Sequence, residues 1–247
     1  MFLSIMTVCY NSKETIRQAM ESVLQQEFTD YEYIIIDGLS TDGTIDIIKE
    51  YLPKFNGKMR YISEKDKGIY DAMNKAISMA KGEIIGLVNS DDYFEKDAFQ
   101  RVFEAAKAKP GMDVYYGCVR VLTPEDKEIK VYRMSHEMLY SCPMAHGGCF
   151  IAGKAHEKYG LYDITYRISA DYDFLLRVFL QGGKFCPIDY VLANFRMGGV
   201  SSDGNNVPEH LKVQYKYGLI SRKGRLISLW IHFVKQFLRK LLKRPSL

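Results

Sequence analysis

The feature that most constrains the fold is a repeated alternation of apolar runs with helical patterns through the first 107 residues. Each of four short apolar runs is followed by a segment whose apolar residues recur at helical spacing. The apolar runs occupy residues 2–9, 31–37, 59–63 and 83–88, and the helical segments occupy residues 13–26, 43–55, 70–80 and 96–107. Because continuous apolar strands linked by helices are typical of a parallel sheet covered on both faces, we expect an α/β fold with right-handed crossovers.

The second half of the chain has a less regular pattern. Strands are predicted at residues 114–121, 129–133 and 147–151, and a helix at residues 170–180 ends before Gly182-Gly183. Residues 196–206 are rich in Gly, Ser and Asn and predict a mobile loop.

Polar and acidic side chains follow all four apolar runs of the first half. They are Thr7 with Cys9-Tyr10-Asn11, then Asp37-Gly38, then Glu64-Lys65-Asp66-Lys67-Gly68, and finally Asn89-Ser90-Asp91-Asp92. Asp and Asn favour turns and helix caps, which explains one or two of these sites but not four in a row. Since ligands of open parallel sheets bind beyond the carboxyl ends of the strands, we expect a binding site at this edge.

The common phosphate-binding motifs are absent from the sequence. It contains no GxxxxGK[ST] and no GxGxxG after the first strand, which argues against a P-loop enzyme and a dinucleotide-dependent dehydrogenase. Carboxylates at the site would repel a diphosphate unless a divalent cation lay between them, and oxygen ligands suit Mn²⁺ or Mg²⁺. A zinc site at Cys142, His146 and Cys149 lacks a fourth ligand at suitable spacing.

Cysteine usage and hydropathy predict a cytoplasmic protein. The five cysteines form no CxxC pair and fit buried thiols in a reducing compartment. No apolar run approaches the roughly 18 residues needed to span a membrane. The N-terminal MFLSIMTVCYNS has no basic residues before its apolar stretch, which argues against a cleaved signal peptide.

Four separated motifs together resemble family 2 glycosyltransferases of the GT-A fold, including those that build bacterial cell-surface polysaccharides. The motifs are TVCYN, IIIDGLSTDGT, EKDKGIYDAMNKAI and KGEIIGLVNSDD, in this order. The resemblance covers about residues 1–100 and, less closely, residues 140–201. It implies a Rossmann-like, mostly parallel sheet flanked by helices.

The resemblance assigns nucleotide contacts to the first two strand ends and the segment after the third. Tyr10 is expected against the nucleotide base with Thr7 beside it. Asp37 is similar to the acid that accepts a hydrogen bond from uracil, and Asp66 is expected to close the other side of the base.

The resemblance also assigns the diphosphate and acceptor sides of the site. Asp91 and Asp92 stand at the place of the DxD-type acids, where one acid binds the ribose and the other, Asp92 by preference, ligates the metal. Asp171 falls at the place of the general base. His146 is expected to bind the acceptor or assist the base, with a buried structural role as the alternative. Arg196 is expected to contact the diphosphate from a covering loop, with an ordinary exposed loop as the alternative.

Three departures from the family pattern bear on these assignments. Asn89 and Ala170 stand where the family often has acids, and the DGLSTDGT turn is one residue longer than usual, so that Asp42 can be a simple helix cap. A structural role for Asp171 would be that of an acid in the first turn of a helix, where it stabilises the macrodipole. Asp173 is the rival candidate for the base.

The last part of the chain concentrates positive charge. No acidic residue follows Glu209, so the first 209 residues carry a net charge of about −6, from 24 basic and 30 acidic residues. The basic residues after Glu209 are Lys212, Lys216, Arg222, Lys223, Arg225, Lys235, Arg239, Lys240, Lys243 and Arg244. The apolar residues recurring among them at helical spacing are Leu226, Trp230, Phe233, Phe237 and Leu241. This pattern predicts an amphipathic helix on a membrane surface, with packing on the protein's own core as the alternative.

The domain prediction follows from these patterns. We expect a glycosyltransferase domain at residues 1–207, whose nucleotide-binding half is about 1–100 and whose acceptor half is about 101–207, and a basic helical tail at 208–247.

The predicted function is a metal-dependent, inverting glycosyltransferase. Its donor is expected to be a nucleotide sugar, preferably a UDP-sugar, and its acceptor a glycan or lipid-linked saccharide on the cytoplasmic face of the membrane. Nucleic acid is not an expected partner, since no aromatic stacking platform accompanies the basic residues. Two other hypotheses are a non-catalytic nucleotide-sugar-binding or membrane-adaptor protein and a nucleotidyltransferase. The latter would need a Gly-rich basic loop where this chain has Tyr10-Asn11-Ser12-Lys13.

Overall fold

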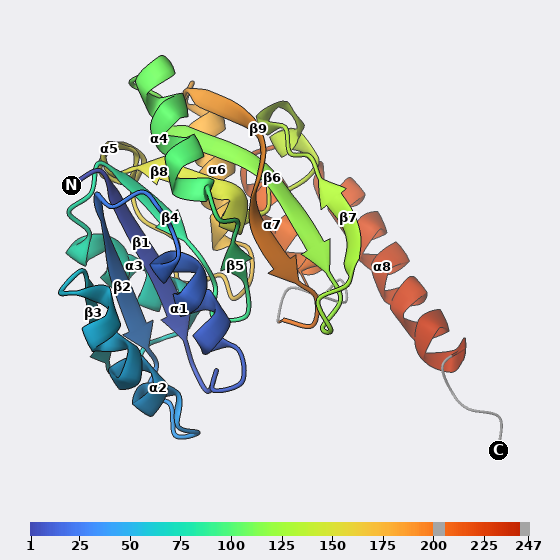
Figure 1. The fold of residues 1–247 in the computed structure, drawn as a ribbon. Helices are drawn as coiled ribbons and strands as arrows, with labels where there is room; N and C mark the ends of the chain where they lie inside the picture. The colour runs from blue at the N-terminus through green and yellow to red at the C-terminus, as the bar shows by residue number, and fades with distance from the viewer. Residues whose placement is uncertain (200–205, 243–247) are drawn as a thin grey trace.

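The computed structural model describes residues 1–199 and 206–242, with side chains up to Lys235 on the last helix. Within these residues, nine strands form one sheet in the order β3-β2-β1-β4-β8-β6-β9-β5, and β7 pairs with β6 (Figure 1). The strands are β1 (Leu3–Cys9), β2 (Tyr31–Asp37), β3 (Met59–Ser63), β4 (Ile84–Leu87), β5 (Tyr93–Phe94), β6 (Val114–Leu122), β7 (Glu128–Tyr132), β8 (Cys149–Ala152) and β9 (Phe185–Arg196). The helices are α1 (Ile16–Leu24), α2 (Thr44–Tyr51), α3 (Ile69–Met79), α4 (Ala98–Ala108), α5 (Gly153–Tyr159), α6 (Ala170–Leu180), α7 (Val207–Lys216) and α8 (Arg222–Leu242).

The first half forms the predicted parallel sheet. β1 lies between β2 and β4 and pairs in parallel with both, so that Leu3 faces Tyr31 on one side and Ile84 on the other. Alternate residues of β1 enter two different cores. Ile5 packs in the core that contains residues of α1, α2 and α4, and Met6 packs in the core that contains residues of α3, α5 and α6. Burial on both faces explains why these strands are apolar throughout, since each buried aliphatic side chain contributes about 1.5–3 kcal/mol.

The second half changes the direction of strand pairing. β8 pairs antiparallel with both β4 and β6, whereas β9 pairs in parallel with β6 and antiparallel with β5. The strands predicted near β6, β7 and β8 are confirmed, but β5 and β9 were not predicted. β9 has the sequence FCPIDYVLANFR, in which Pro187 and Asp189 interrupt the apolar pattern that identified the other strands. β9 ends at Arg196, so the first residue of the predicted loop belongs to a strand.

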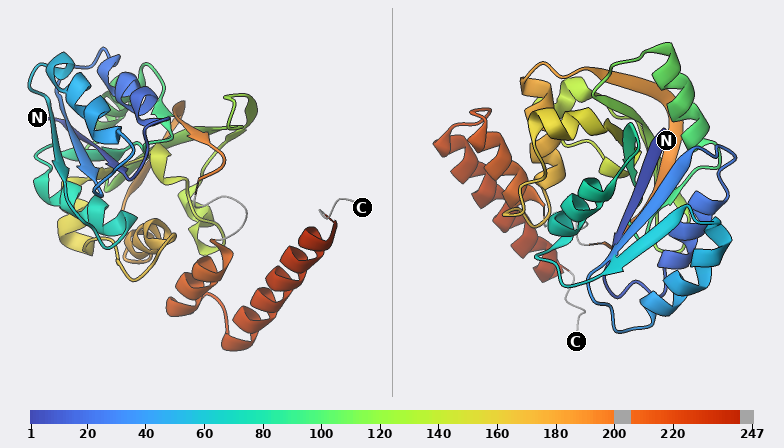
Figure 2. Two further views of the ribbon diagram at one scale, coloured as in Figure 1. Left: turned by 90° about the horizontal axis from the view of Figure 1, so that it is seen from below. Right: turned by 90° about the vertical axis from the view of Figure 1, so that its left-hand side faces the viewer.

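The two C-terminal helices differ in their contacts. α7 packs against α6, and its Val213 is part of the core that contains α3, α5 and α6. α8 extends away from the body of the protein (Figures 1 and 2). Among the described residues, no helix is long and apolar enough to cross a membrane. Residues 200–205 of the predicted loop, together with Lys243 and Arg244, lie outside the described residues, as do the side chains of Phe237, Arg239, Lys240 and Leu241.

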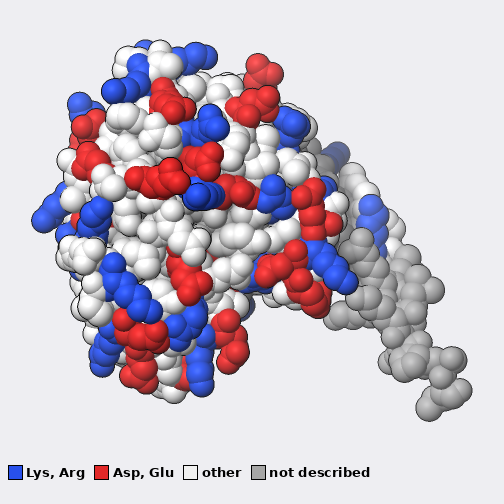
Figure 3. Space-filling view, in the orientation of Figure 1, with Lys and Arg blue, Asp and Glu red and all other residues white. Residues whose placement is uncertain are grey.

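Basic and acidic side chains are interspersed on the face of the protein seen in Figure 1. The space-filling view of that face shows neither sign of charge forming a continuous field over the body (Figure 3). The positive charge found in the last part of the sequence is therefore a property of the C-terminal helices rather than of this face.

Candidate active site

Tyr10, Gly38 and Asp66 form a close group where β1 and β2 end, which we call the Gly38 group. Tyr10 follows β1 and is 64% exposed. A Cβ atom placed on Gly38 would lie 2.7 Å from Oδ2 of Asp66 and 3.4 Å from Cδ2 of Tyr10. Oδ1 of Asp66 accepts a hydrogen bond from the backbone N–H of Gly68 at 2.9 Å, which orients the carboxylate. Only glycine permits this approach of the acid and the ring to the chain.

Asp37 and Thr7 are fully buried beneath this edge of the sheet. Oδ2 of Asp37 accepts hydrogen bonds from the backbone N–H of Ser40 at 3.0 Å and from the Ser63 hydroxyl at 2.7 Å. The Thr7 hydroxyl donates to the carbonyl oxygen of Val88 at 2.8 Å. Both side chains support the turns at the strand ends and present no exposed surface in this structure.

The acid pair Asp91-Asp92 follows β4, whose last residue is Leu87, after three intervening residues. Asp92 is 4% exposed, and its two oxygens are held by different parts of the chain. Oδ1 accepts the backbone N–H of Arg196, and Oδ2 accepts the side-chain amide of Asn89, each at 2.9 Å. Asp91 is half-buried, and a Cβ placed on Gly199 would lie 3.0 Å from its Oδ2. The chain beyond β9 therefore lies directly against the acid pair.

Burial and mutual repulsion change the acidity of the pair. Burial, followed by the charge of Asp91, raises the pKa of Asp92 to about 7, although the hydrogen bonds from Arg196 and Asn89 oppose the rise. Burial also raises the pKa of Asp91, and the Arg196 charge opposes it. A nearby positive charge would lower both pKa values and favour the ionised pair.

The donor atoms around the pair fit a hard divalent cation. Oδ1 of Asn89 is buried and has no hydrogen-bond partner among the described residues. With the carboxylates of Asp91 and Asp92 it makes a set composed only of oxygens, as Mg²⁺ and Mn²⁺ prefer. The residues that the structure describes contain no group of three or more His, Cys, Asp or Glu side chains that could hold a metal. Substrate oxygens and water would have to complete the shell.

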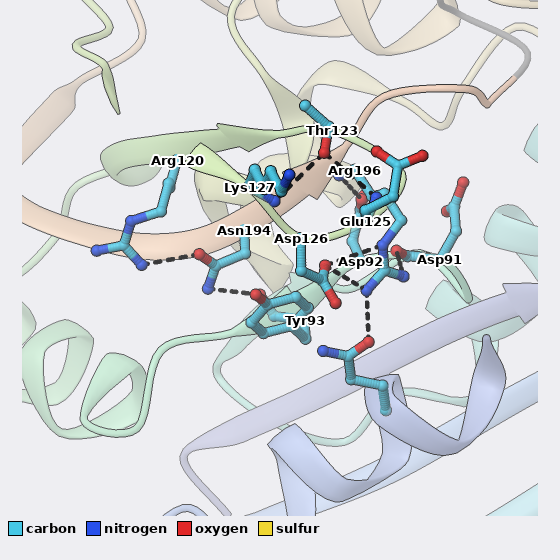
Figure 4. A network of polar contacts seen from close by, with 11 residues as sticks. Asp91, Asp92, Tyr93, Arg120, Thr123, Glu125, Asp126, Lys127, Asn194 and Arg196 are labelled. Atoms are coloured by element: carbon cyan, nitrogen blue, oxygen red, sulfur yellow. Dashed lines mark hydrogen bonds and ion pairs between the residues drawn. The ribbon is translucent and has the colours of Figure 1, made fainter. Parts of the chain in front are cut away.

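Arg196 connects the acid pair to two other elements (Figure 4). Its guanidinium donates to Oδ1 of Asp126, in the β6–β7 turn, from Nε at 3.1 Å and from Nη2 at 2.6 Å. It also donates to the backbone oxygen of Asp91 at 2.8 Å and to the side-chain oxygen of Gln18 in α1. Arg196 therefore lies beside the pair, with its side chain 11% exposed. Sequence analysis had not identified Gln18 or Asp126, which no motif marks.

Asp171 lies in the first turn of α6 and is half-buried. The Tyr70 hydroxyl is 2.9 Å from its Oδ1 and 2.6 Å from the Ile168 carbonyl oxygen, so one hydrogen is shared between two acceptors. Burial raises the pKa of Asp171, and hydrogen bonds from the Tyr172 backbone and Tyr70 oppose the rise. Such a carboxylate is a better proton acceptor than a fully solvated one. Tyr70 belongs to the EKDKGIYDAMNKAI motif, which could have signalled its role.

Asp173, the rival candidate for the base, has a different environment. It is fully buried, and its Oδ1 pairs with Nζ of Lys216 in α7 at 2.7 Å. Arg177 lies 3.9 Å from its other oxygen. This carboxylate joins α6 to α7, and its contacts favour Asp171 as the acid available to a substrate.

His146 lies in a buried aromatic group. Its Nε2 is 2.7 Å from the Tyr162 hydroxyl, and burial lowers the pKa of His146 to about 4, so the ring is neutral at physiological pH. The Tyr162 ring lies 5.7 Å from the Tyr70 ring, which connects His146 indirectly to Asp171. The thiol of Cys149 donates to the carbonyl oxygen of Ala145 and that of Cys142 contacts the Tyr132 hydroxyl, so neither is directed at His146.

Contacts along the carboxyl edge join these groups into one site. The hydroxyls of Ser12, after β1, and Ser90, after β4, are 2.9 Å apart. The Gly38 group joins the end of β2 to the segment before α3, and Tyr70 of α3 reaches Asp171. The edge therefore carries an acid pair that follows β4 and a separate half-buried acid on α6, the two kinds of acidic group that the resemblance to glycosyltransferases calls for.

The comparison with protein families makes the identification definite. The model of "Glycosyl transferase family 2" matches residues 4–167, and the chain belongs to this family.

Curated relatives have the same class of activity. A PGL/p-HBAD biosynthesis glycosyltransferase of Mycobacterium tuberculosis (strain H37Ra) is 27% identical over 177 residues, covering 71% of this chain and 69% of its own. Chondroitin synthase of Escherichia coli is 30% identical over 198 residues, covering 78% of this chain but 28% of its own. This chain therefore corresponds to a part of that larger enzyme.

Solved structures show the same fold at low sequence identity. S. aureus TarS 1-349 in complex with UDP-GlcNAc has a TM-score of 0.69 and 18% identity, covering 92% of this chain and 69% of that one. The longer TarS chain is covered to 41%. The mannosyltransferase PcManGT from Pyrobaculum calidifontis, in complex with GDP-Man and Mn²⁺, has a TM-score of 0.67 and 18% identity, covering 88% of this chain and 64% of that one.

Proposed function

We propose that this family 2 glycosyltransferase is metal-dependent and inverting, and that it moves a sugar from a nucleoside diphosphate donor to a hydroxyl of a glycan or lipid-linked saccharide. The observation that carries the proposal is the separation of carboxylates along one sheet edge. Asp91 and Asp92 lie together beside Arg196, while Asp171 lies apart from them on α6 against Tyr70. This arrangement provides separate places for the leaving diphosphate and for the attacking hydroxyl.

The Gly38 group is proposed to hold the nucleotide base. The exposed ring of Tyr10 offers a stacking surface, and Asp66 offers a carboxylate acceptor to a base N–H. Asp37 and Thr7 hold the strand ends that carry these two residues. UDP is the preferred nucleotide, supported by the UDP-GlcNAc complex of TarS, and GDP is the first alternative, supported by the GDP-Man complex of PcManGT.

Asp91 and Asp92 are proposed to hold Mn²⁺ or Mg²⁺, with Asn89 Oδ1 as a further oxygen. When bound, the cation neutralises charge that develops on the leaving diphosphate. The protein's own contribution is to aim the oxygens, since Asn89 and the Arg196 backbone fix the rotamer of Asp92. The Arg196 guanidinium, once released from Asp126, would supply donors to the same diphosphate.

Asp171 is proposed as the general base. Its carboxylate takes the proton of the acceptor hydroxyl while that oxygen attacks the anomeric carbon from the face opposite the diphosphate. The bond from the anomeric carbon to the diphosphate breaks in the same step, which inverts the configuration. Tyr70 holds the carboxylate in place, and general-base catalysis of this kind contributes about 10²–10⁴ in rate. His146, neutral and buried, is proposed to shape the acceptor side through Tyr162.

The acceptor is proposed to be membrane-linked, because α8 presents an apolar surface away from the body. Its exposed large side chains are Leu226, Ile227, Trp230, Ile231 and Phe233. Basic residues accompany this surface, as in helices that bind anionic bilayers. We propose peripheral attachment to the cytoplasmic face and a role in cell-surface polysaccharide assembly.

A donor panel tests the proposal. UDP-, GDP- and dTDP-sugars are incubated with the full chain with and without Mn²⁺, and nucleotide release and binding are measured. Mn²⁺-dependent release of one nucleoside diphosphate, abolished in Asp171→Asn, is expected. Failure of every nucleotide sugar to bind, with or without metal, would overturn the proposal.

A further inference from the structure

Glu209 in the first turn of α7 makes an unusual set of contacts with the chain just before α6. Its Oε1 accepts the backbone N–H of Arg167 at 2.9 Å. Its Oε2 accepts the backbone N–H groups of Ile168 at 2.8 Å and Ser169 at 3.1 Å. One carboxylate therefore satisfies three consecutive backbone donors on a different element.

One of these donors, the Ser169 N–H, lies at the N-cap position of α6, and the other two belong to the residues just before the helix. α6 begins at Ala170, and Ser169 before it provides no side-chain cap; its buried hydroxyl has no hydrogen-bond partner among the described residues. An anion at a helix N-terminus is favoured both by the donors and by the helix dipole. Hydrogen bonds to an ionised acceptor are about twice as strong as neutral ones. Glu209 thus anchors the N-cap residue of α6 and the two residues before it, where no local side-chain cap is formed.

The segment held by Glu209 carries the candidate base. Asp171 is two residues beyond Ser169, and Tyr70 shares its hydroxyl hydrogen between Asp171 and the carbonyl oxygen of Ile168. Glu209 fixes Ile168 from its N–H side, while Tyr70 fixes it from its carbonyl side. A shift of this peptide would therefore move both Asp171 and its hydrogen-bond donor.

We propose that Glu209 is a positioning residue for Asp171. In this proposal α7 helps to build the active site and is not merely the beginning of a C-terminal tail. The proposal rests on the proposed function of Asp171 as general base. Misplacement of a catalytic group by about 1 Å can cost about 10²-fold in rate. Loss of the Glu209 carboxylate is expected to lower kcat by about 10- to 100-fold and to leave donor binding within about two-fold of the native value.

The test compares Glu209→Ala and Glu209→Gln with a matched control on the same helix. Gln214 also fastens α7, through contacts of its side-chain amide with the carbonyl oxygen of Ser141 and the hydroxyl of Tyr172, but it does not touch the three amides. Gln214→Ala should loosen α7 and keep kcat within about two-fold. Glu209→Gln retains one acceptor oxygen and should recover part of the kcat lost in Glu209→Ala.

Amide hydrogen exchange gives a readout independent of turnover. The amides of residues 167–169 should exchange at least about 10-fold faster in Glu209→Ala than in the native chain and keep their native rate in Gln214→Ala. Equal kcat losses in Glu209→Ala and Gln214→Ala would overturn the proposal, as would native kcat or native exchange in Glu209→Ala. A native chain that turns over no donor would overturn the proposed function instead, a result distinct from an active enzyme insensitive to Glu209.

Discussion

The backbone N–H of Arg196 donates to Oδ1 of Asp92 at 2.9 Å, joining the end of β9 to the acid pair that follows β4. The strand that carries Arg196 therefore fixes the rotamer of the carboxylate proposed to ligate the metal. The Arg196 side chain extends from the same point to Asp126 (Figure 4). It also donates a hydrogen bond to the side-chain oxygen of Gln18. The proposed diphosphate end of the site thus depends on four separate segments of the chain, and substitutions in each of them can test it.

Asp171→Asn should abolish sugar transfer while leaving the donor site intact. An amide is the same size as the carboxylate but cannot take the acceptor's proton, so a loss of about 10²–10⁴ in kcat is expected. UDP affinity, measured by calorimetry, should stay within about two-fold. Asp173→Asn is the matched control on the same helix. It should lower the melting temperature, because Lys216 loses its ionised partner, yet retain kcat in the folded protein. Equal kcat losses in the two variants would assign a structural role to Asp171.

Metal binding should strengthen as pH rises through about 7. The pKa of Asp92 is raised to about 7 by burial and by Asp91, and a cation binds only the ionised form. The melting-temperature increase caused by Mg²⁺ should therefore be larger at about pH 8 than at about pH 6, and Asp92→Asn should remove the difference.

Without metal, the same group should affect stability in the opposite sense. The folded state holds the Asp92 proton more tightly than the unfolded chain does. Stability therefore falls as pH rises from about 4, the usual aspartate value, to about 7. Metal-free melting temperatures across this range, compared with those of Asp92→Asn, measure the effect. A native profile as flat as that of the variant would contradict the raised pKa.

Arg196→Ala should weaken donor binding by about 10-fold or more, because charge-assisted hydrogen bonds to a diphosphate are lost. Asp126→Asn should instead keep or improve donor affinity, since the guanidinium is released from its carboxylate partner. Calorimetry with UDP and Mn²⁺ measures both affinities. Equal weakening in the two variants would show that the Arg196–Asp126 pair serves only to hold the β6–β7 turn.

Gly38→Ala should raise the dissociation constant for UDP by about 10-fold or more, because the new methyl group would lie 2.7 Å from Asp66 Oδ2 and displace it or Tyr10. Gly153→Ala is the control, since its Cβ would find its nearest neighbour at 3.5 Å, an ordinary contact. Fluorescence or calorimetric titration measures the affinities. Native affinity in Gly38→Ala would exclude the Gly38 group as the base site.

Charged residues on the apolar face of α8 should release the protein from membranes. Trp230 is 68% exposed, and Trp230→Glu combined with Phe233→Glu places two negative charges where lipid contact is proposed. Flotation with vesicles containing anionic lipid should show binding of the native chain and its loss in the double variant. Glu157→Gln, at a position on α5, is a surface control. Equal flotation of native and double-variant protein would contradict membrane attachment.

Local sequence patterns were sufficient for the first half of the fold and for most of the candidate site. Strands such as β1 and β2 are buried on both faces, so their apolar runs are continuous and recognisable. Because parallel strands end at one edge, Tyr10, Asp66 and the Asp91-Asp92 pair are predicted from the sequence to lie along the same edge of the sheet. Their motif spacing also identified the family, which the family model confirmed.

Only the tertiary structure decided which other residues hold the candidate site residues in place. β9 escaped prediction because its register depends on β6 and β5, far away in the sequence, and its own pattern is interrupted. Glu209 holds the segment before α6 from another helix, and Asp126 holds Arg196 from a turn, and neither contact produces a periodic pattern in the sequence. The burial of the Asp37 and Thr7 side chains likewise could not be inferred from the sequence pattern. The periodicity of a sequence shows which side of one segment packs against the apolar core. Hydrogen bonds and ion pairs between residues far apart in the sequence are determined only when the whole chain packs.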